Sequence, residues 1–394
     1  MWRHRLRWPP MSRCVISLVA ALVLGTPLAA QNGAAPERKI VTDRAVAGAI
    51  IARDQDVDDA VARGLAWLDG QQNKNGFWHG VVGSRGRGYT PIASYELQVQ
   101  TGSGHLGVTA LCGMAFLAGG NLPGRGQYGA NVRRAANAVL SCVQENGMLT
   151  TSGSRMYSHA FASLFLAEVY GNAASSELKS GLERCTHIIV DTQNAHGGWR
   201  YNAFSRDADL SVTVCQLQAL RAAHNIGINI PKSTIDRAVA YVVQHQVPSG
   251  RAKGLYYYSI HGRRAFRKTD KYSIQAAAAT SLLSAGIYEA KLLDEVVDFL
   301  ERDLDEVMKY SPHHYYFWYG NYYASQVFFQ ADGLLREGCF DRYYQKMRTH
   351  LLADQMPDGR WRNPTDEGPG DAFGTAVACI ILQIPRHYLP IFQR

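Results

Sequence analysis

The strongest constraint on the fold of this 394-residue chain is a repeated segment. In it, a helical run ends in glutamine and leads through a glycine turn to an aromatic residue. The clearest copy runs from Arg63 through Gln72 and Gly76 to Trp78. The glutamines of the five copies are Gln72, Gln144, Gln193, Gln246 and Gln355. The last interval spans about two periods, and its missing copy falls on 292–309, which reads as an amphipathic helix without the glutamine ending. Such a recurring unit is typical of helical repeat architectures.

A second set of helical runs, richer in apolar and small residues, alternates with the repeats. We expect these helices at 105–117, 154–169, 209–223, 270–284, 320–335 and 371–382. A helix that is apolar on all sides is buried, whereas the amphipathic repeat helices suit an outer layer. No strand-like alternation persists. These patterns predict an all-α fold over 56–394, an α/α toroid of about six helix pairs in inner and outer layers. An open helical solenoid is the structural alternative.

The repeat glutamines and tryptophans are predicted to be structural. A glutamine in the last turn of a helix can hydrogen-bond carbonyls that the helix leaves unpaired. Glycine permits the positive-φ exit that follows, and tryptophan covers the joint with a large apolar face. We therefore expect no catalytic role for these residues.

The pattern Arg-Gly-x-x-Trp-Leu, then Gln, then Gly-x-Trp over 63–78 resembles the QW repeat of squalene–hopene cyclases and other terpenoid cyclases. Protein prenyltransferase β subunits use the same α/α toroid. The run 388–394 resembles the end of exported bacterial prenyltransferase/squalene-cyclase repeat proteins. The resemblance covers nearly all of 56–394 and implies the toroid. It does not imply an activity, because one fold supports many functions.

Asp209 is the candidate catalytic acid. Class II cyclases protonate an alkene with an aspartate of a DxDD motif, and 207–213 resembles that segment with Leu210 in place of the last aspartate. In this alignment Asp209 takes the place of the proton donor. The alternative is that Asp209 is a helix N-cap, a position that aspartate favours. The run 56–59 matches DxDD by letters, but it opens an outer helix, where acids favour the helix dipole.

A basic segment, 251–271, contains a candidate anion site. The run 264–273 is similar to a prenyltransferase segment in which Arg, Lys and Tyr contact a diphosphate, which implies Arg264, Arg267 and Tyr272 as ligands. A solvated basic loop is the alternative. The cysteine and histidine that bind zinc in that family are missing, so we expect no metal and no cofactor.

Seven aromatic residues lie within 315–323. Tyr316, Trp318 and Tyr319 are candidates for lining a ligand cavity, where aromatic faces can stabilise a carbocation. Packing of the repeat that lost its glutamine ending is the alternative. The insertion 80–104 is expected to form a surface loop.

Residues 1–30 are predicted to be a secretory signal peptide, because four arginines and no acids flank a short apolar run and a small-residue cleavage site. A polar linker, 31–55, follows. The chain is then exported, to the periplasm or outside the cell, with no transmembrane helix after cleavage. Cleavage would lower the net charge from +8 to +4, because it removes four arginines. The charge therefore gives no reason to propose nucleic-acid binding. Six cysteines remain, either as free thiols or as disulfides.

Two functions fit these observations. The first is an exported binding toroid with a degenerate catalytic site, whose ligand (an isoprenoid, a lipid, a peptide or a glycan) lies in or on the central cavity. The alternative is a terpenoid-cyclase-like or prenyltransferase-like enzyme acting on an isoprenoid. An enclosed aromatic pocket that Asp209 faces would favour the enzyme.

Overall fold

The computed structural model describes residues 54–80, 95–151, 155–260, 271–309, 311, 316–363 and 369–392, except for the side chains of 95–97. The predicted signal peptide 1–30, and nearly all of the predicted linker, lie outside the described residues. None of the helices in these ranges is long and apolar enough to cross a membrane.

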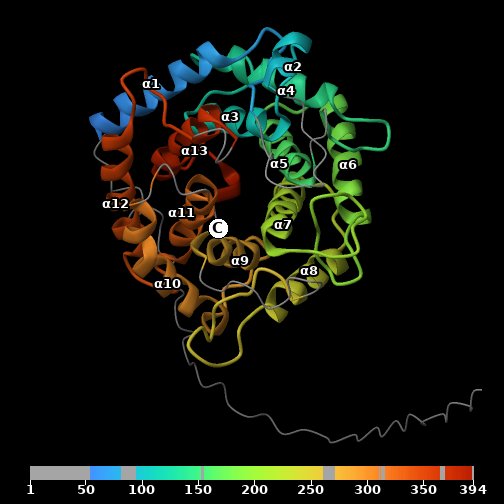
Figure 1. Cartoon of the computed structure of the whole chain (residues 1–394). Helices are drawn as coiled ribbons and strands as arrows, with labels where there is room; N and C mark the ends of the chain where they lie inside the picture. The colour runs from blue at the N-terminus through green and yellow to red at the C-terminus, as the bar shows by residue number, and fades with distance from the viewer. Residues whose placement is uncertain are drawn as a thin grey trace, which may run out of the picture. The chain divides into compact units, whose positions relative to one another are not determined.

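Thirteen α-helices and no strand are found in the described ranges, and all but one of the helices alternate between two concentric layers (Figure 1). The outer helices are α1 (Gln55–Gln71), α4 (Gly129–Ser141), α6 (Ser176–Asp191), α8 (Lys232–Gln244), α10 (Ala290–Lys309) and α12 (Cys339–Asp354). The inner helices are α3 (Leu106–Ala118), α5 (Met156–Asn172), α7 (Leu210–Asn225), α9 (Tyr272–Ser284), α11 (Phe317–Ala331) and α13 (Asp371–Gln383). The predicted all-α toroid of six helix pairs is confirmed.

The exception is a short helix, α2 (Tyr95–Thr101), in the segment that we expected to be a loop. The rest of the expectation for 80–104 falls mostly on residues outside the described ranges. Gln98 on this helix donates to the carbonyl of Gly80 at 2.8 Å. This long-range bond is a contact that no local sequence pattern indicates.

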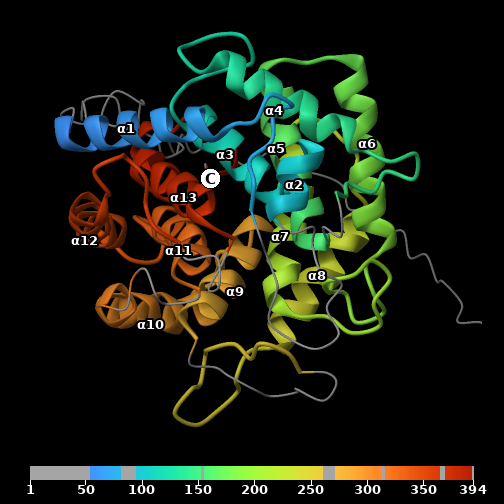
Figure 2. The ribbon, with the colours of Figure 1, turned by 45° about the horizontal axis from the view of Figure 1, so that its top comes forward.

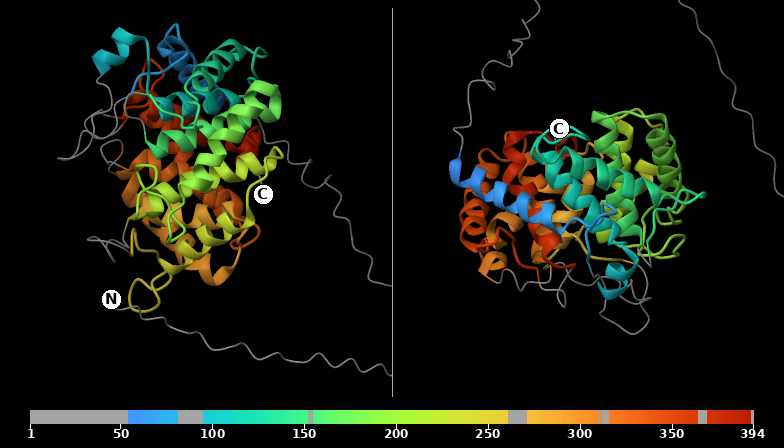
Figure 3. Two further views of the ribbon diagram at one scale, coloured as in Figure 1. Left: turned by 90° about the vertical axis from the view of Figure 1, so that its right-hand side faces the viewer. Right: turned by 90° about the horizontal axis from the view of Figure 1, so that it is seen from above.

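The inner helices are buried on nearly every side, as their composition predicted (Figures 2 and 3). In α3 and α9 every residue is buried. Because each inner helix follows an outer one, the inner helices run in the same direction. Their N-terminal ends therefore form one face of the ring, the N-terminal face, and their C-terminal ends form the other.

Four of the repeat glutamines each join an outer helix to the next one around the ring. The side-chain amide of Gln193 donates to the carbonyl of Gly197 in its own turn (2.8 Å) and to that of Thr234 in α8 (2.9 Å). Gln72 and Gln246 make equivalent bonds to α4 and α10. The amide of Gln355 reaches the carbonyl of Ala60 in α1 at 2.8 Å and so closes the ring.

Three repeat tryptophans each join an outer helix to its inner partner. The indole N–H of Trp78, Trp199 and Trp361 donates to a carbonyl ten residues earlier, at 2.7–2.8 Å. The backbone N–H of each donates to a threonine hydroxyl of the following inner helix. Gly76 takes φ +92° at this turn, and a Cβ there would collide with the carbonyl of Arg134 in α4. The three tryptophans are buried, in agreement with their predicted structural role.

Side chains cross the inside of the inner barrel between α7 and α11. Tyr319 donates to the carbonyl of Ser211 at 2.8 Å. One level deeper, the Tyr323 hydroxyl lies 3.0 Å from the Cys215 thiol. Gln218 donates to Gln326 below them, at 2.5 Å. This ladder fills the barrel interior between the two helices with protein atoms.

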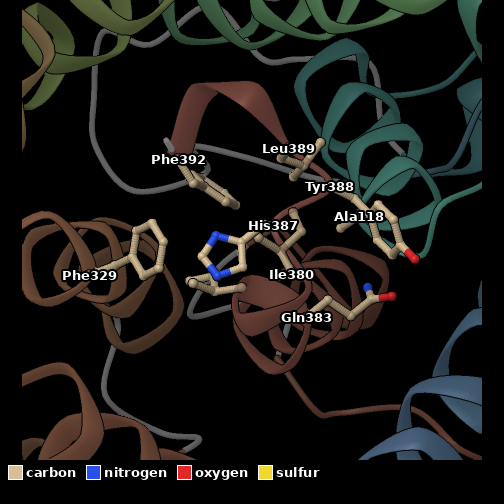
Figure 4. A pocket seen from close by; sticks show the side chains of 9 residues that line it. Ala118, Phe329, Ile380, Gln383, His387, Tyr388, Leu389 and Phe392 are labelled. Atoms are coloured by element: carbon tan, nitrogen blue, oxygen red, sulfur yellow. The ribbon is translucent and has the colours of Figure 1, made fainter. Parts of the chain in front are cut away.

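The C-terminal segment closes the other face of the ring. After α13 the chain turns through Ile384–Arg386 and Pro390–Phe392, two short 3-10 helices, towards the centre (Figure 1). Phe392 is buried against Tyr322, with their ring centres 6.3 Å apart. A cavity of about 10 Å³, room for about one water molecule, remains beside the rings of Phe329 and His387 (Figure 4).

Candidate functional site

Asp209 is the N-cap of α7, and its side chain is fully buried. One carboxylate oxygen accepts the backbone N–H of Val212 at 2.9 Å and the Ser211 hydroxyl at 2.6 Å. The other oxygen accepts the Tyr258 hydroxyl at 2.9 Å and the guanidinium of Arg200. Four donors therefore surround this carboxylate.

Arg200 comes from the loop that joins α6 to α7, directly after the repeat tryptophan. Its guanidinium also approaches Asp207 at 3.5 Å and donates to the Tyr258 hydroxyl at 3.2 Å. It lies over the ring of Tyr201, 4.3 Å from the ring centre, in cation–π geometry. Arg200 thus links the loop to the buried acid.

Backbone hydrogen bonds hold the two loops that carry these groups. The carbonyl of Tyr201 accepts the N–H of Met156 at the start of α5, at 3.0 Å. The carbonyl of Tyr258, in the segment after α8, accepts the N–H of Leu210 at 3.3 Å. These bonds fix both tyrosines against the N-terminal ends of neighbouring inner helices.

Tyrosine hydroxyls extend the contacts of Asp209 outward. The hydroxyls of Tyr201 and Tyr258 are 2.7 Å apart, and that of Tyr157 lies 2.6 Å from Ser211 Oγ. The rings of Tyr157 and Tyr201 stack at 5.9 Å. We call the whole group the rim cluster; it comprises Tyr157, Arg200, Tyr201, Asp209, Ser211, Tyr258 and Tyr319.

The electrostatics of the rim cluster keep Tyr157 and Tyr258 neutral and Arg200 charged. Burial raises the pKa of Tyr157 well above its usual value, and nearby groups including Asp209 raise it further. Burial also raises the pKa of Tyr258, again with Asp209 adding to the effect. For Arg200, burial acts to lower the pKa, but the charge of Asp209 opposes it and the net shift is upward. The hydroxyls of Tyr157 and Tyr258 therefore remain protonated hydrogen-bonding groups across the physiological pH range.

The arrangement around Asp209 is suited to holding structure rather than to giving up a proton. A carboxyl group that protonates a substrate must present its proton to that substrate. Here both oxygens are occupied by donors of the protein itself, and one of these donors is a guanidinium. The contacts match the N-cap alternative that we weighed for Asp209.

The other predicted site residues lie in different places. Tyr319 belongs to the rim cluster. Trp318 is buried and donates to the carbonyl of Arg362 at 3.1 Å, whereas Tyr316 is exposed at the surface. The hydroxyl of Tyr272 is buried against Asn321, at 3.3 Å, so its position gives no support to an anion site. Arg264 and Arg267 lie outside the described residues.

Sequence reasoning missed Tyr157, Arg200, Tyr201 and Tyr258 as neighbours of Asp209. One signal was present, because Arg200 and Tyr201 directly follow the repeat tryptophan and precede the cap of the next inner helix. Tyr157 and Tyr258 lie 52 and 49 residues from Asp209, so only the packing of three repeats brings them together.

No group of three or more His, Cys, Asp or Glu side chains in the described part of the chain is placed to hold a metal ion. All six cysteines there are free, and five of them are buried. Burial raises the pKa of Cys215, beneath Asp209, to about 12, so this thiol is not a ready nucleophile.

No family model matches the chain, and no curated protein matches it. Solved structures are similar in fold. A type II terpene cyclase from Scytonema, MstE, bound to the substrate geranylgeranyl dihydroxybenzoate, is 13% identical with a TM-score of 0.54, over 85% of this chain and 98% of that one. An α-1,6-mannanase from Salegentibacter, in complex with α-1,6-mannotriose, is 9% identical. Its TM-score is 0.58, and the match covers 84% of this chain and 99% of that one. A cellobiose 2-epimerase from Spirochaeta thermophila is 15% identical. Its TM-score is 0.58, and the match covers 87% of this chain and 98% of that one. These similarities establish the α/α toroid and no particular activity.

Proposed function

We propose that this protein is an exported, non-catalytic binding toroid whose ligand docks on the N-terminal face of the inner helices, against the rim cluster. The observation that carries the proposal is that four hydrogen-bond donors of the protein occupy both carboxylate oxygens of Asp209. The residue that resembles a cyclase acid serves as the anchor of a hydrogen-bonded surface.

The packing of the barrel also favours binding at the rim over chemistry inside. A drug-sized or larger apolar ligand is usually enclosed in a pocket of roughly 300–1,000 Å³. Between α7 and α11 the barrel is instead crossed by side chains, and the C-terminal segment closes the other face. An isoprenoid-sized substrate would have to displace this packing.

The rim cluster has the composition of a recognition surface. Tyrosines provide large, rigid, amphipathic contact area at low entropic cost. Tyr157, Tyr201, Tyr258 and Tyr319 are each only partly buried, and Asp207 beside them is exposed. Beyond the cluster, Phe204 on the same loop is 69% exposed and takes φ +58°, a conformation that non-glycine residues rarely adopt. Strained, exposed aromatics of this kind concentrate at functional sites.

The test combines a search for bound molecules with a search for turnover. The purified chain is incubated with a bacterial cell-envelope extract, bound molecules are identified by native mass spectrometry, and hydrogen exchange maps the contact. We expect protection of peptides covering Tyr157, Tyr201 and Tyr258, with the bound molecule unchanged. Squalene, geranylgeranyl diphosphate and α-1,6-mannotriose are incubated in parallel, and we expect no product.

Asp209→Asn is the diagnostic variant, and Asp236→Asn, at an exposed aspartate of the outer helix α8, is its control. Product formed by the wild type but not by Asp209→Asn would establish an enzyme and overturn the binding function. Ligand capture without protection of the N-terminal face would show that the site lies elsewhere.

A further inference from the structure

We propose that residues 387–392 form a latch on the C-terminal face of the barrel, which Glu168 of α5 holds shut and which opens when this carboxyl group becomes charged. The inference is independent of the ligand proposed for the N-terminal face. The loops that follow α3, α5, α7, α9 and α11 all lie within the described residues. Of the residues that follow α13, only 393 and 394 lie outside them.

One side of the latch faces the barrel interior and the other faces solvent. Ile391 and Phe392 are buried, whereas Tyr388 is exposed. The short helix Pro390–Phe392 packs against both α7 and α11. The ring of Phe392 lies inward, against Tyr322, and also lines the small cavity of Figure 4. Outward movement of the latch would therefore admit water to the interior between these two helices.

The latch starts from a fixed point. Arg386 pairs with Asp58 of α1, which ties the chain just before the latch to an outer helix. The next residue, His387, lies against the ring of Phe329 and takes φ +57°, a conformation that non-glycine residues rarely adopt. Here the chain turns from α13 towards the centre of the ring (Figure 1). A rotation at His387 would move the latch while α13 and the closed ring stay in place.

Glu168 lies beneath the latch, on the inward face of α5. It follows two turns after Phe161, whose ring meets Tyr322 across the barrel at 5.7 Å. The side chain of Glu168 is 5% exposed and accepts a hydrogen bond from the backbone N–H of Ile391. Its Oε2 atom has no hydrogen-bond partner in the described part of the chain. The latch thus donates to this acid and also shuts water out from it.

The surroundings of Glu168 offer its charge no compensation. Its titratable neighbours inside the barrel are Tyr322 of α11 and, beyond it, Cys215 of α7, and burial raises the pKa of both, so both are neutral. Arg221 of α7 donates to the carbonyl of Leu283. On α3, α4, α6 and α7, the helices packed against α5, no described lysine, arginine or histidine pairs with Glu168.

The cost of a buried charge couples the latch to pH. A carboxylate without a counter-ion is costly to bury, and burial raises the pKa of Glu168 to about 8. With the latch open, water reaches the carboxyl group and its pKa returns towards 4.5. Between these values the closed form keeps its proton and the open form loses it. The ratio of open to closed molecules therefore rises about tenfold per pH unit and levels off above pH 8.

Hydrogen exchange of the full chain between pH 5.5 and 7.5 measures the opening. Exchange rates of peptides covering 387–392 are divided by the intrinsic rates at each pH, which removes the direct effect of pH on exchange. We expect the protection of these peptides to fall about tenfold per pH unit. Peptides of α9, which is buried along its whole length, should stay about a hundredfold or more better protected at every pH.

Four variants separate the acid from the packing. Glu168→Gln has no carboxyl group to ionise and should make the protection of the latch independent of pH. Glu145→Gln, at an exposed glutamate, is the matched control and should keep the wild-type dependence. Phe392→Ala loosens the latch but keeps the acid, so protection should fall about tenfold or more at every pH with the same slope. Arg394→Gln removes the terminal arginine, outside the described residues, and should leave the slope unchanged.

Protection of 387–392 that does not change with pH in the wild type would overturn the latch. So would a slope that survives in Glu168→Gln. Equal protection of the latch and of α9 would show that the whole molecule unfolds and that no local opening occurs. Loss of the slope in Arg394→Gln would assign the pH dependence to that arginine instead of to the burial of Glu168.

Discussion

Glu168 on α5 shows how strongly a single buried residue can make stability depend on pH. Its side chain is almost fully buried, and burial raises its pKa to about 8, although a hydrogen bond from the backbone of Ile391 opposes the shift. The carboxyl group therefore ionises at higher pH in the folded chain than in the unfolded chain. Its contribution to stability is present below pH 4.5, its unfolded value, and is lost as the pH rises towards 8.

We predict that Glu168→Gln stabilises the fold at pH 8 and changes it little at pH 4.5. The neutral amide removes the cost of ionisation, which is on the order of 4 kcal/mol at pH 8. Urea unfolding of variant and wild type at several pH values measures the difference. Glu145→Gln, at an exposed glutamate, is the control. The difference in unfolding free energy between this variant and the wild type should not change with pH. If the unfolding free energies of the wild type and Glu168→Gln depended on pH in the same way, the burial of Glu168 would be contradicted.

At the scale of the element, four of the joints between repeats consist of a glutamine side-chain amide bonded to backbone carbonyls. The fifth repeat lacks this joint. Instead, α10 is linked to the segment that contains α12 by ion pairs, including Lys346 with Asp305 at 2.8 Å and Arg342 with Glu301. Exposed ion pairs contribute little each, so this joint is expected to be weaker than those made by glutamine.

We predict that Gln193→Ala lowers the free energy of unfolding by about 2–3 kcal/mol, because two backbone carbonyls, those of Gly197 and Thr234, lose their donor. Chemical denaturation measures the loss. Gln144→Ala tests a repeat glutamine that is exposed and should change stability by less than about 0.5 kcal/mol. Equal losses for both variants would refute a specific role for the buried joint.

At the scale of the whole molecule, the two ends of the described chain complete the ring. Arg348 of α12 pairs with Asp54, and Arg386 after α13 pairs with Asp58. Arg348 lowers the pKa of Asp54, so this contact stabilises the ring above about pH 4 and is lost as the pH falls below it. Asp54 and two acids of the run 56–59, Asp56 and Asp58, thus take part in ring closure.

We predict that Phe392→Ala costs about 3–5 kcal/mol of stability, the usual loss for a buried aromatic. The reason is that Phe392 packs against Tyr322 inside the barrel. Tyr388→Ala, four residues earlier and 57% exposed, should cost less than about 1 kcal/mol. Thermal and chemical unfolding of both variants distinguish a packed segment from a loose tail. A mild effect of Phe392→Ala would mean that the segment is not part of the core.

The sequence by itself determined the layers and the joints of this protein. The alternation of amphipathic and wholly apolar helices identified the outer and inner rings, and the start of α7 followed from an aspartate before an apolar run. These features depend on contacts within one repeat or between adjacent repeats. Because such contacts recur from repeat to repeat, the residues that make them recur at regular intervals in the sequence. For the same reason, Gln193 and Trp199 could be recognised as structural.

Only the tertiary structure decided what surrounds Asp209. Its carboxylate is held by a loop arginine and by a tyrosine 49 residues away, and a second tyrosine, Tyr157, approaches from the preceding repeat. The cross-barrel ladder pairs residues 108 positions apart. No local pattern encodes such meetings, because they depend on the curvature of the closed ring. That curvature brings together side chains which, in an open array of the same repeats, would remain apart.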